Sequence, residues 1–301
     1  MGASDKEHSV KTIGFVGLGT MGAPMARNLL RGGFALNAYD IDAKALAALV
    51  SDGAVAAGSP AEASRGTDAV VTMLPNSEHV EAALFGRDGI ADAMAPGSLF
   101  IEMSTIAPAA TDRFARAMAE RGVDMVDAPV GRSSQHAVEG RLLIMAGGSQ
   151  AAVERARPVL EKLGDTIVHC GAVGMGARMK IVNNFMSIAL NSLTAEALVL
   201  AEASGLDPEL ARTVMLGTAA GQGHMSTTYP GKVLKGDLTP GFMVDLAHKD
   251  LGLARDLAAG LGVAVPTGTA AGALYDAARA AGRGRQDWTA LYDLARAAAR
   301  Q

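Results

Sequence analysis

Residues 12–31 read TIGFVGLGTMGAPMARNLLR, and this stretch decides the fold. Ile13–Val16 is a short apolar run that predicts a buried strand. The glycine-rich segment Gly17–Gly22 follows at once, and Ala23–Arg31 then has the spacing of an amphipathic helix. A strand, a glycine-rich turn and a helix in this order are typical of the first unit of a doubly wound α/β sheet.

The turn has the GxGxxG spacing that places the phosphates of a dinucleotide at the start of a helix. Gly17 allows the tight turn, Gly19 lets a pyrophosphate approach backbone N–H groups, and Gly22 allows close packing between helix and strand. Asp40 ends the next predicted strand, about twenty residues further on, where a carboxylate binds the adenine ribose hydroxyls. Because a carboxylate repels a 2′-phosphate, the sequence favours NAD over NADP.

Strand-like and helix-like patterns alternate up to about residue 169, and only helical patterns follow. Ala177–Ala203 contains no Pro or Gly and predicts one helix of roughly 40 Å at 1.5 Å per residue. We therefore expect α/β architecture, with an N-terminal Rossmann domain of mostly parallel strands joined by this long helix to an all-α domain. The expected divisions are a flexible tail over 1–11, an NAD-binding domain over 12–170, and a helical substrate and oligomerisation domain over 171–301.

Length and composition exclude several classes of protein. The chain has 301 residues, of which 49% are hydrophobic, so it can form a sizeable core and is not of the disordered class. The formal net charge of −4 offers no basic stripe for nucleic acid. No apolar run approaches the roughly 18–20 residues that cross a bilayer. The single cysteine, Cys170, fits a reducing compartment, so we expect a cytoplasmic protein that binds neither nucleic acid nor membrane. The six histidines show no metal-ligand spacing, and no metal is expected.

A second group of candidate residues lies on the long helix. Four polar side chains recur there at i, i+3, i+4 and i+7, which places them on one face: Lys180, Asn183, Asn184 and Ser187. The flanking positions are apolar, so this stripe is expected to line a site in an otherwise buried helix. Lys180 can protonate the alkoxide that hydride transfer to a carbonyl produces, and Asn184 can orient the lysine or hold the carbonyl oxygen. The alternative is a polar seam that neighbouring backbone satisfies.

The turn Asp127–Ser134 follows a predicted strand, as loops at a switch point do. Arg132 offers a planar fork of donors, and Ser133 adds a hydroxyl. Together with the amides of the turn they would suit an oxyanion such as a carboxylate or a sulfonate. A solvated loop arginine is the alternative.

Four motifs in order resemble the 3-hydroxyacid (β-hydroxyacid) dehydrogenase family. They are the cofactor signature Phe15–Asn28, the loop Asp127–Leu142, the segment Gly171–Gly176 followed by Lys180 and Asn184, and the segment Lys249–Asp256. The resemblance implies an NAD-dependent oxidoreductase in which Lys180, assisted by Asn184, acts on the substrate oxygen. The expected cofactor contacts are Gly17, Leu18, Gly19, Thr20, Met21, Gly22, Asp40, Leu74, Pro75, Thr105 and Lys249.

The chain departs from the family at Gly131-Arg132-Ser133, where most members carry Ser-Gly-Gly. In this it is similar to a branch that reduces 3-sulfolactaldehyde to 2,3-dihydroxypropane-1-sulfonate with NADH. A sulfonate has three acceptor oxygens and stays ionised, so a fixed arginine with amide and hydroxyl donors suits it. The expected substrate contacts are Gly131, Arg132, Ser133, Asn183, Asn184 and Ser187.

Other readings stay open at this point. A reductase that converts succinic semialdehyde to 4-hydroxybutyrate, or another 3-hydroxyacid dehydrogenase, would also suit Arg132. An imine reductase shares this fold, but such enzymes resemble the family with the lysine replaced. A non-catalytic NAD-binding interaction module is the alternative from a different class, and Lys180 and Asn184 argue against it. The Ala-rich helical half predicts a homodimer or homotetramer.

Overall fold

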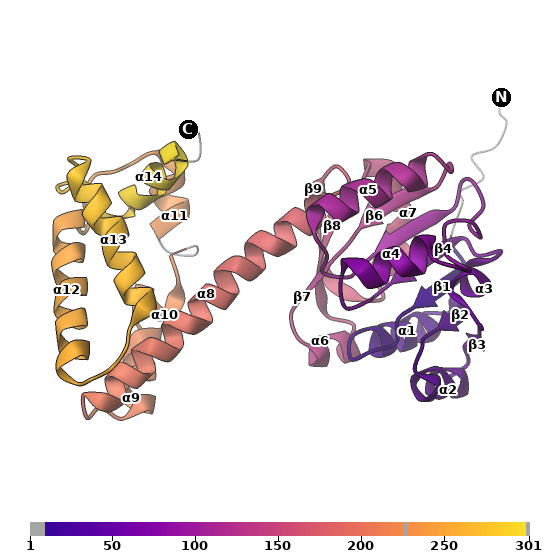
Figure 1. Cartoon of the computed structure of the whole chain (residues 1–301), viewed down its shortest axis with the longest axis horizontal. Coiled ribbons are helices and arrows are strands. Elements are labelled where there is room, and N and C mark those ends of the chain that lie inside the picture. Colours follow the sequence, from indigo (N-terminus) through magenta and orange to yellow (C-terminus); the bar gives the residue numbers. More distant parts are fainter. Residues whose placement is uncertain (1–9, 225–227, 299–301) are drawn as a thin grey trace. The chain divides into compact units, whose positions relative to one another are not determined.

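The computed structural model describes residues 10–224 and 228–298 (Figure 1). Its contacts divide the chain into two units between Phe185 and Met186. Residues 1–9 of the predicted tail lie outside the described residues. Val10 is buried, and the Lys11 N–H donates to Asp68 Oδ2 at 2.9 Å, so the folded part already includes these last two residues of that predicted tail.

The first unit contains a nine-stranded sheet, counted over the residues that the structure describes. The order is β3-β2-β1-β4-β5-β6-β8-β7, and β9 pairs with β8. Neighbours from β3 to β6 are parallel, whereas β8 runs antiparallel to β6 and β7, so the predicted mostly parallel, doubly wound sheet is confirmed. The strands are β1 Thr12–Val16, β2 Ala35–Tyr39, β3 Val55–Ala56, β4 Ala69–Thr72, β5 Leu99–Glu102, β6 Asp124–Asp127, β7 Val130–Gly131, β8 Leu142–Gly147 and β9 Gly164–Gly171.

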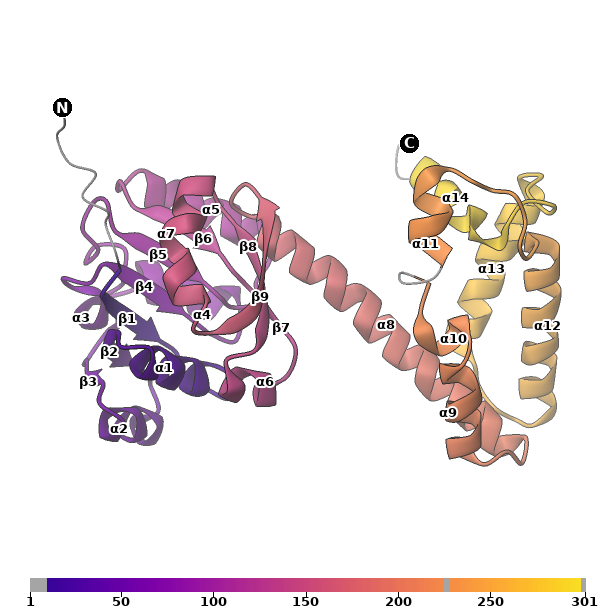
Figure 2. The ribbon, with the colours of Figure 1, turned by 180° about the vertical axis from the view of Figure 1, so that it is seen from behind.

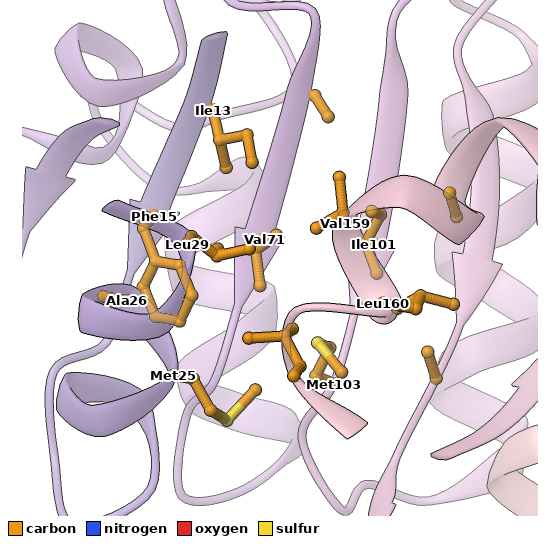
Figure 3. Packing of buried hydrophobic residues seen from close by; sticks show 14 of the residues in the cluster. Ile13, Phe15, Met25, Ala26, Leu29, Val71, Ile101, Met103, Val159 and Leu160 are labelled. Atoms are coloured by element: carbon orange, nitrogen blue, oxygen red, sulfur yellow. The ribbon is translucent and has the colours of Figure 1, made fainter. Parts of the chain in front are cut away.

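Helices cover both faces of this sheet, because successive strand residues point to opposite sides. Phe15 of β1 lies beside Met25 and Leu29 of the first helix in one core (Figure 3). The next residue, Val16, belongs to a second core, which Phe114 of the fifth helix also joins. The helices of this unit are α1 Gly22–Arg31, α2 Ala43–Ser51, α3 Pro60–Ser64, α4 Ser77–Phe85, α5 Pro108–Ala119, α6 Ser134–Glu139 and α7 Gln150–Leu160.

The carboxyl ends of the parallel strands meet at one edge, where ligands bind in sheets of this kind. The register pairs Val16 with Thr72, Thr72 with Glu102, and Glu102 with Asp127. The glycine-rich turn after β1 therefore shares this edge with the loops that follow β4, β5 and β6.

The second unit is helical, and α8 runs into it from the first without a break (Figures 1 and 2). α8 spans Met175–Ala203, so the predicted long helix is confirmed and begins two residues earlier than expected. Within this unit the Glu196 carboxylate accepts the N–H groups of Thr267 and Gly268, at the start of a later helix, at 2.8 and 3.2 Å. The remaining elements are α9 Pro208–Leu216, α10 Ala219–Gln222, α11 Thr228–Gly231, η1 Val233–Lys235, α12 Val244–Gly260, α13 Pro266–Ala280, η2 Trp288–Ala290 and α14 Leu291–Ala298.

Two expectations about α8 need correction. Among the described residues it is the one helix that is long and apolar enough to cross a membrane, whereas no such segment was expected from the sequence. A core helix of a soluble protein passes the same test, so length and composition alone do not assign α8 to a membrane. The helix was also expected to be buried around its polar stripe. In the single chain Val182, Phe185 and Ile188 are exposed by 64%, 77% and 67%.

Candidate active site

The glycine-rich turn has the geometry that its sequence predicts. Gly17 has a φ of +101°, and a Cβ there would collide with the Met73 carbonyl oxygen. A Cβ on Gly22 would collide with the Gly17 carbonyl oxygen, so α1 approaches the turn as closely as glycine allows. A Cβ on Gly19 would meet no atom within 4 Å. The backbone at Gly19 is thus open at the start of α1, where a helix N-terminus attracts phosphate.

A cavity of about 720 Å³ lies against this turn. Eight of the predicted cofactor contacts line it: Gly17, Gly19, Thr20, Met21, Gly22, Asp40, Leu74 and Pro75. The other lining residues were not predicted from the sequence: Val16, Tyr39, Ile41, Asp42, Pro60, Met73, His79, Ala82, Ala83 and Arg87. Several of these lie on or just after α4, the helix that follows β4, and the position of that helix was the signal that could have found them.

Asp40 directly follows β2 and forms a hydrogen bond with the glycine-rich turn. Its Oδ2 accepts the Leu18 N–H at 2.5 Å, and its Oδ1 accepts the Asp42 N–H at 2.7 Å. Leu18 itself points inward and is 2% exposed, so its side chain belongs to the core and only its backbone bonds to Asp40. The carboxylate is half-buried and lines the cavity, where it lies at the end of the strand as predicted.

The buried carboxyl group of Glu102 connects the loops that follow β4 and β5 at the same edge of the sheet. Glu102 accepts hydrogen bonds from the Thr72 hydroxyl and, at 2.6 Å, from the Ser104 N–H. The Ser104 hydroxyl in turn accepts the Leu74 N–H at 2.8 Å. Burial raises the pKa of Glu102 to about 7, although these bonds oppose the shift. The loop with Leu74 and the loop with exposed Thr105, both predicted cofactor contacts, are therefore tied together.

Lys180 lies on the second turn of α8 and is half-buried. Burial lowers the pKa of its ammonium below the usual 10.5, and over the described residues the structure gives that ammonium no hydrogen-bond or ion-pair partner. Asn184 is half-buried one turn on, and its Oδ1 accepts from exposed Asn183 Nδ2 at 3.3 Å. Ser187 is exposed a further turn along the helix, beyond the division between the units.

Arg132 is exposed, but its guanidinium has three hydrogen-bond partners. Its φ is +75°, a conformation that L side chains rarely adopt, at the end of β7. Nη1 donates to Asp165 Oδ1 at 2.6 Å and to the Arg141 carbonyl oxygen, and Nη2 donates to Thr166 Oγ1 at 3.3 Å. The guanidinium is thereby held against the start of β9. An anionic substrate at Arg132 would share it with the Asp165 carboxylate.

The remaining predicted contacts have simpler surroundings. Ser133 is exposed, and its hydroxyl lies 2.8 Å from His136 Nδ1. Gly131 pairs with Leu143 across β7 and β8. Lys249 is exposed on α12 in the second unit. Over the described ranges no group of three His, Cys, Asp or Glu side chains could hold a metal ion.

A glycine-rich turn beside a cavity, an acidic residue after β2 and a half-buried lysine on α8 are the features expected of a nicotinamide-dependent oxidoreductase. Two family descriptions match the chain: the NAD binding domain of 6-phosphogluconate dehydrogenase over residues 12–171, and the NAD-binding region of NADP-dependent 3-hydroxyisobutyrate dehydrogenase over residues 174–295. The chain belongs to the NAD(P)-dependent 3-hydroxyacid dehydrogenase family that includes 3-hydroxyisobutyrate dehydrogenase, and it is an enzyme of that family. The predicted family is confirmed.

Individual relatives agree with this family. The chain is 50% identical to 3-sulfolactaldehyde reductase of Escherichia coli over 93% of this chain and 94% of that one. It is 39% identical to 3-hydroxyisobutyrate dehydrogenase of Pseudomonas aeruginosa over 87% and 90% of the two chains. The solved structure of Mycobacterium tuberculosis 3-hydroxyisobutyrate dehydrogenase with L-serine is 35% identical, with a TM-score of 0.67 over 95% of this chain and 99% of that one.

Proposed function

We propose that the protein reduces 3-sulfolactaldehyde to 2,3-dihydroxypropane-1-sulfonate with NADH as the hydride donor. The observation that carries the proposal is the 50% identity with 3-sulfolactaldehyde reductase over nearly the whole length of both chains. Arg132 supports it, because a charged guanidinium stands at the tip of β7 and is fixed there by hydrogen bonds.

The residues at the carboxyl ends of the parallel strands fit a dinucleotide. The backbone at Gly19 is open there, and the 720 Å³ cavity adjoins it. When bound, the nicotinamide supplies the hydride that adds to the aldehyde carbon. The turn Gly17–Gly22 and the start of α1 hold the pyrophosphate. We assign NADH rather than NADPH, because the Asp40 carboxylate lines the cavity where it would repel a 2′-phosphate.

The chain's own contribution to the chemistry is a proton and an anion site. The Lys180 ammonium donates a proton to the aldehyde oxygen as negative charge develops there, and Asn184 orients that oxygen. A lysine with a lowered pKa releases this proton more readily than an exposed one. Arg132, with Gly131, Ser133, Asn183 and Ser187, holds the sulfonate.

A second candidate substrate is succinic semialdehyde, which would give 4-hydroxybutyrate. One contact favours it: the Asp165 carboxylate already satisfies the Arg132 guanidinium at 2.6 Å. A substrate carboxylate could therefore make the same contact.

The deciding assay is NADH oxidation by the purified protein with 3-sulfolactaldehyde, succinic semialdehyde and tartronate semialdehyde at equal concentrations, repeated with NADPH. We expect kcat/KM to favour the sulfonate by at least about tenfold, which is about 1.4 kcal/mol of transition-state binding. We expect NADH to be preferred over NADPH. A preference for either carboxylate would move the substrate to that aldehyde and keep the Lys180 chemistry. If none of the three aldehydes is turned over, the proposed reductase activity is wrong and the alternative of a non-catalytic dinucleotide-binding module is favoured.

We also propose that the protein is a homodimer or homotetramer. The exposed apolar side chains of α8, among them Val182, Phe185 and Ile188, would be covered by a second copy. The solution mass, measured by light scattering, is then expected to be two or four times 30.7 kDa. A mass of one chain would contradict the proposal.

A further inference from the structure

Asp127, the last residue of β6, binds the start of α8. Its Oδ1 accepts the Gly174 N–H at 2.6 Å, and its Oδ2 accepts the Ala177 N–H at 2.7 Å. The first N–H groups of a helix have no partner within the helix. Asp127 is 1% exposed, so both bonds are made away from water. One buried carboxylate therefore accepts two N–H groups at the start of the helix that carries Lys180.

Two glycines bring this turn unusually close to the sheet. A Cβ on Gly147 of β8 would lie 2.5 Å from Asp127 Oδ1 and 2.7 Å from the Gly176 nitrogen. A Cβ on Gly176 of α8 would collide with the Met145 carbonyl oxygen. The start of α8 therefore packs directly against the β8 backbone and the Asp127 carboxylate.

A second carboxylate holds the same turn from another side. Asp112 of α5 binds Arg178 of α8 with both oxygens, at 3.0 Å to Nη1 and 2.7 Å to Nη2. Arg178 Nη1 also donates to the Gly174 carbonyl oxygen at 3.0 Å. This ion pair is partly exposed, so the fully buried Asp127 is the stronger constraint.

We infer that Asp127 is a positioning residue for proton transfer, which fixes the first turn of α8 and thereby the position of Lys180, one turn further on. The inference rests on the proposed role of Lys180. A displacement of about 1 Å at a reacting group can cost about a hundredfold in rate, so an anchor three residues away affects turnover without touching the substrate.

The charge state of Asp127 suits this task. Burial raises its pKa to about 6, against the lowering effect of the Gly174 and Ala177 N–H groups. Glu102, its register partner on β5, has a pKa raised to about 7 by burial. At neutral pH and above, Asp127 is therefore the ionised acceptor that both N–H groups require.

Asp127→Asn tests the inference with the full-length enzyme. The amide can accept one of the two N–H groups but presents its own NH₂ to the other. We expect kcat, counted per NADH-binding site, to fall by at least about tenfold. The dissociation constant for NADH should stay within about twofold, because Asp127 does not line the cofactor cavity.

Asp124→Asn is the matched control, because Asp124 lies on the same strand and its exposed carboxylate pairs with Arg155 at 2.6 Å. We expect its kcat to stay within about twofold of the parent enzyme. Equal kcat per NADH-binding site in Asp127→Asn and Asp124→Asn would overturn the inference.

A second readout does not depend on turnover. The pH profile of Lys180 acylation, followed by mass spectrometry of the Lys180 peptide, reports the pKa of that amine. The midpoint should lie below 10.5 in the parent protein and move toward 10.5 in Asp127→Asn, as the helix start loosens and Lys180 gains water. If the parent enzyme turns over none of the aldehydes, the proposed function fails, while this midpoint still decides the positioning role.

Asp112→Asn covers the case in which Asp127→Asn does not fold. Its site is partly exposed, so the variant is expected to fold, with kcat lowered by about threefold or more and the acylation midpoint raised. An unchanged kcat together with an unchanged midpoint would overturn the claim that anchoring of this turn positions Lys180.

Discussion

Lys180→Ala is expected to lower kcat for aldehyde reduction by about 100- to 10,000-fold, the usual contribution of a general acid. The ammonium is half-buried and unpaired over the described residues, so its removal leaves no side chain on that turn to protonate the alkoxide. The affinity for NADH, measured by fluorescence titration, should be unchanged, because Lys180 does not line the cofactor cavity. Steady-state turnover under saturating NADH gives the comparison.

The pH profile separates proton donation from a structural role of Lys180. Only the protonated lysine donates, so kcat for reduction should be constant above the Asp127 pKa of about 6 and fall as the pH rises through the Lys180 pKa, below 10.5. Lys180→Arg should keep the charge and lose turnover, because arginine does not release its proton in this range. Lys162→Ala, which removes an exposed lysine that lies outside the proposed site, is the control. Near-normal turnover of Lys180→Ala would remove this lysine from the mechanism.

Arg132→Gly is expected to raise KM for the anionic aldehyde by about 10- to 100-fold, the value of a hydrogen bond to a charged group. Glycine is the informative substitution, because the φ of +75° suits it and the loss of the guanidinium is then not mixed with backbone strain. KM for NADH should change little. Initial rates across a range of aldehyde concentrations provide the measurement.

Asp165→Asn is the opposing variant. Asp165 takes one amino group of Arg132 at 2.6 Å, so neutralising it leaves the guanidinium more available to the substrate. We expect KM for the anionic aldehyde to fall in Asp165→Asn and to rise in Arg132→Gly. KM for an uncharged aldehyde such as glyceraldehyde should be unchanged in both variants. An unchanged KM for the anionic aldehyde in both variants would show that the anion binds elsewhere.

The sheet could be predicted in detail where strands are apolar and flanked by turns. β1 covers the predicted strand Ile13–Val16 and begins one residue earlier, and α1 covers the predicted helix Ala23–Arg31 and also begins one residue earlier. The two-residue strands β3 and β7 were missed, because a strand that short shows no alternation to detect. The long helix α8 was predicted correctly, because a long run without the helix breakers Pro and Gly favours a single helix.

The site was predictable only where local pattern determines it. The glycine turn and Asp40 follow from spacing, and eight predicted contacts line one cavity. The bond from Arg132 to Asp165 joins residues on different elements, and no periodicity connects them. Asp127 was quoted as part of the loop motif without a role. Its two N–H donors lie nearly fifty residues further along the chain and meet it only after β6, β8 and α8 have packed together.

Under the proposed preference for NADH, Asp40 links the choice of cofactor to the hydrogen bonding of the glycine turn. The same carboxylate that lines the cavity also accepts the Leu18 N–H, so under the proposed preference for NADH it would both hold the turn and repel a 2′-phosphate. Replacing it with an apolar residue to admit a 2′-phosphate would leave that N–H without its acceptor and loosen the turn that holds the pyrophosphate. A change of coenzyme by this route, in evolution or in engineering, therefore requires a residue such as Ser or Asn whose oxygen still accepts this bond.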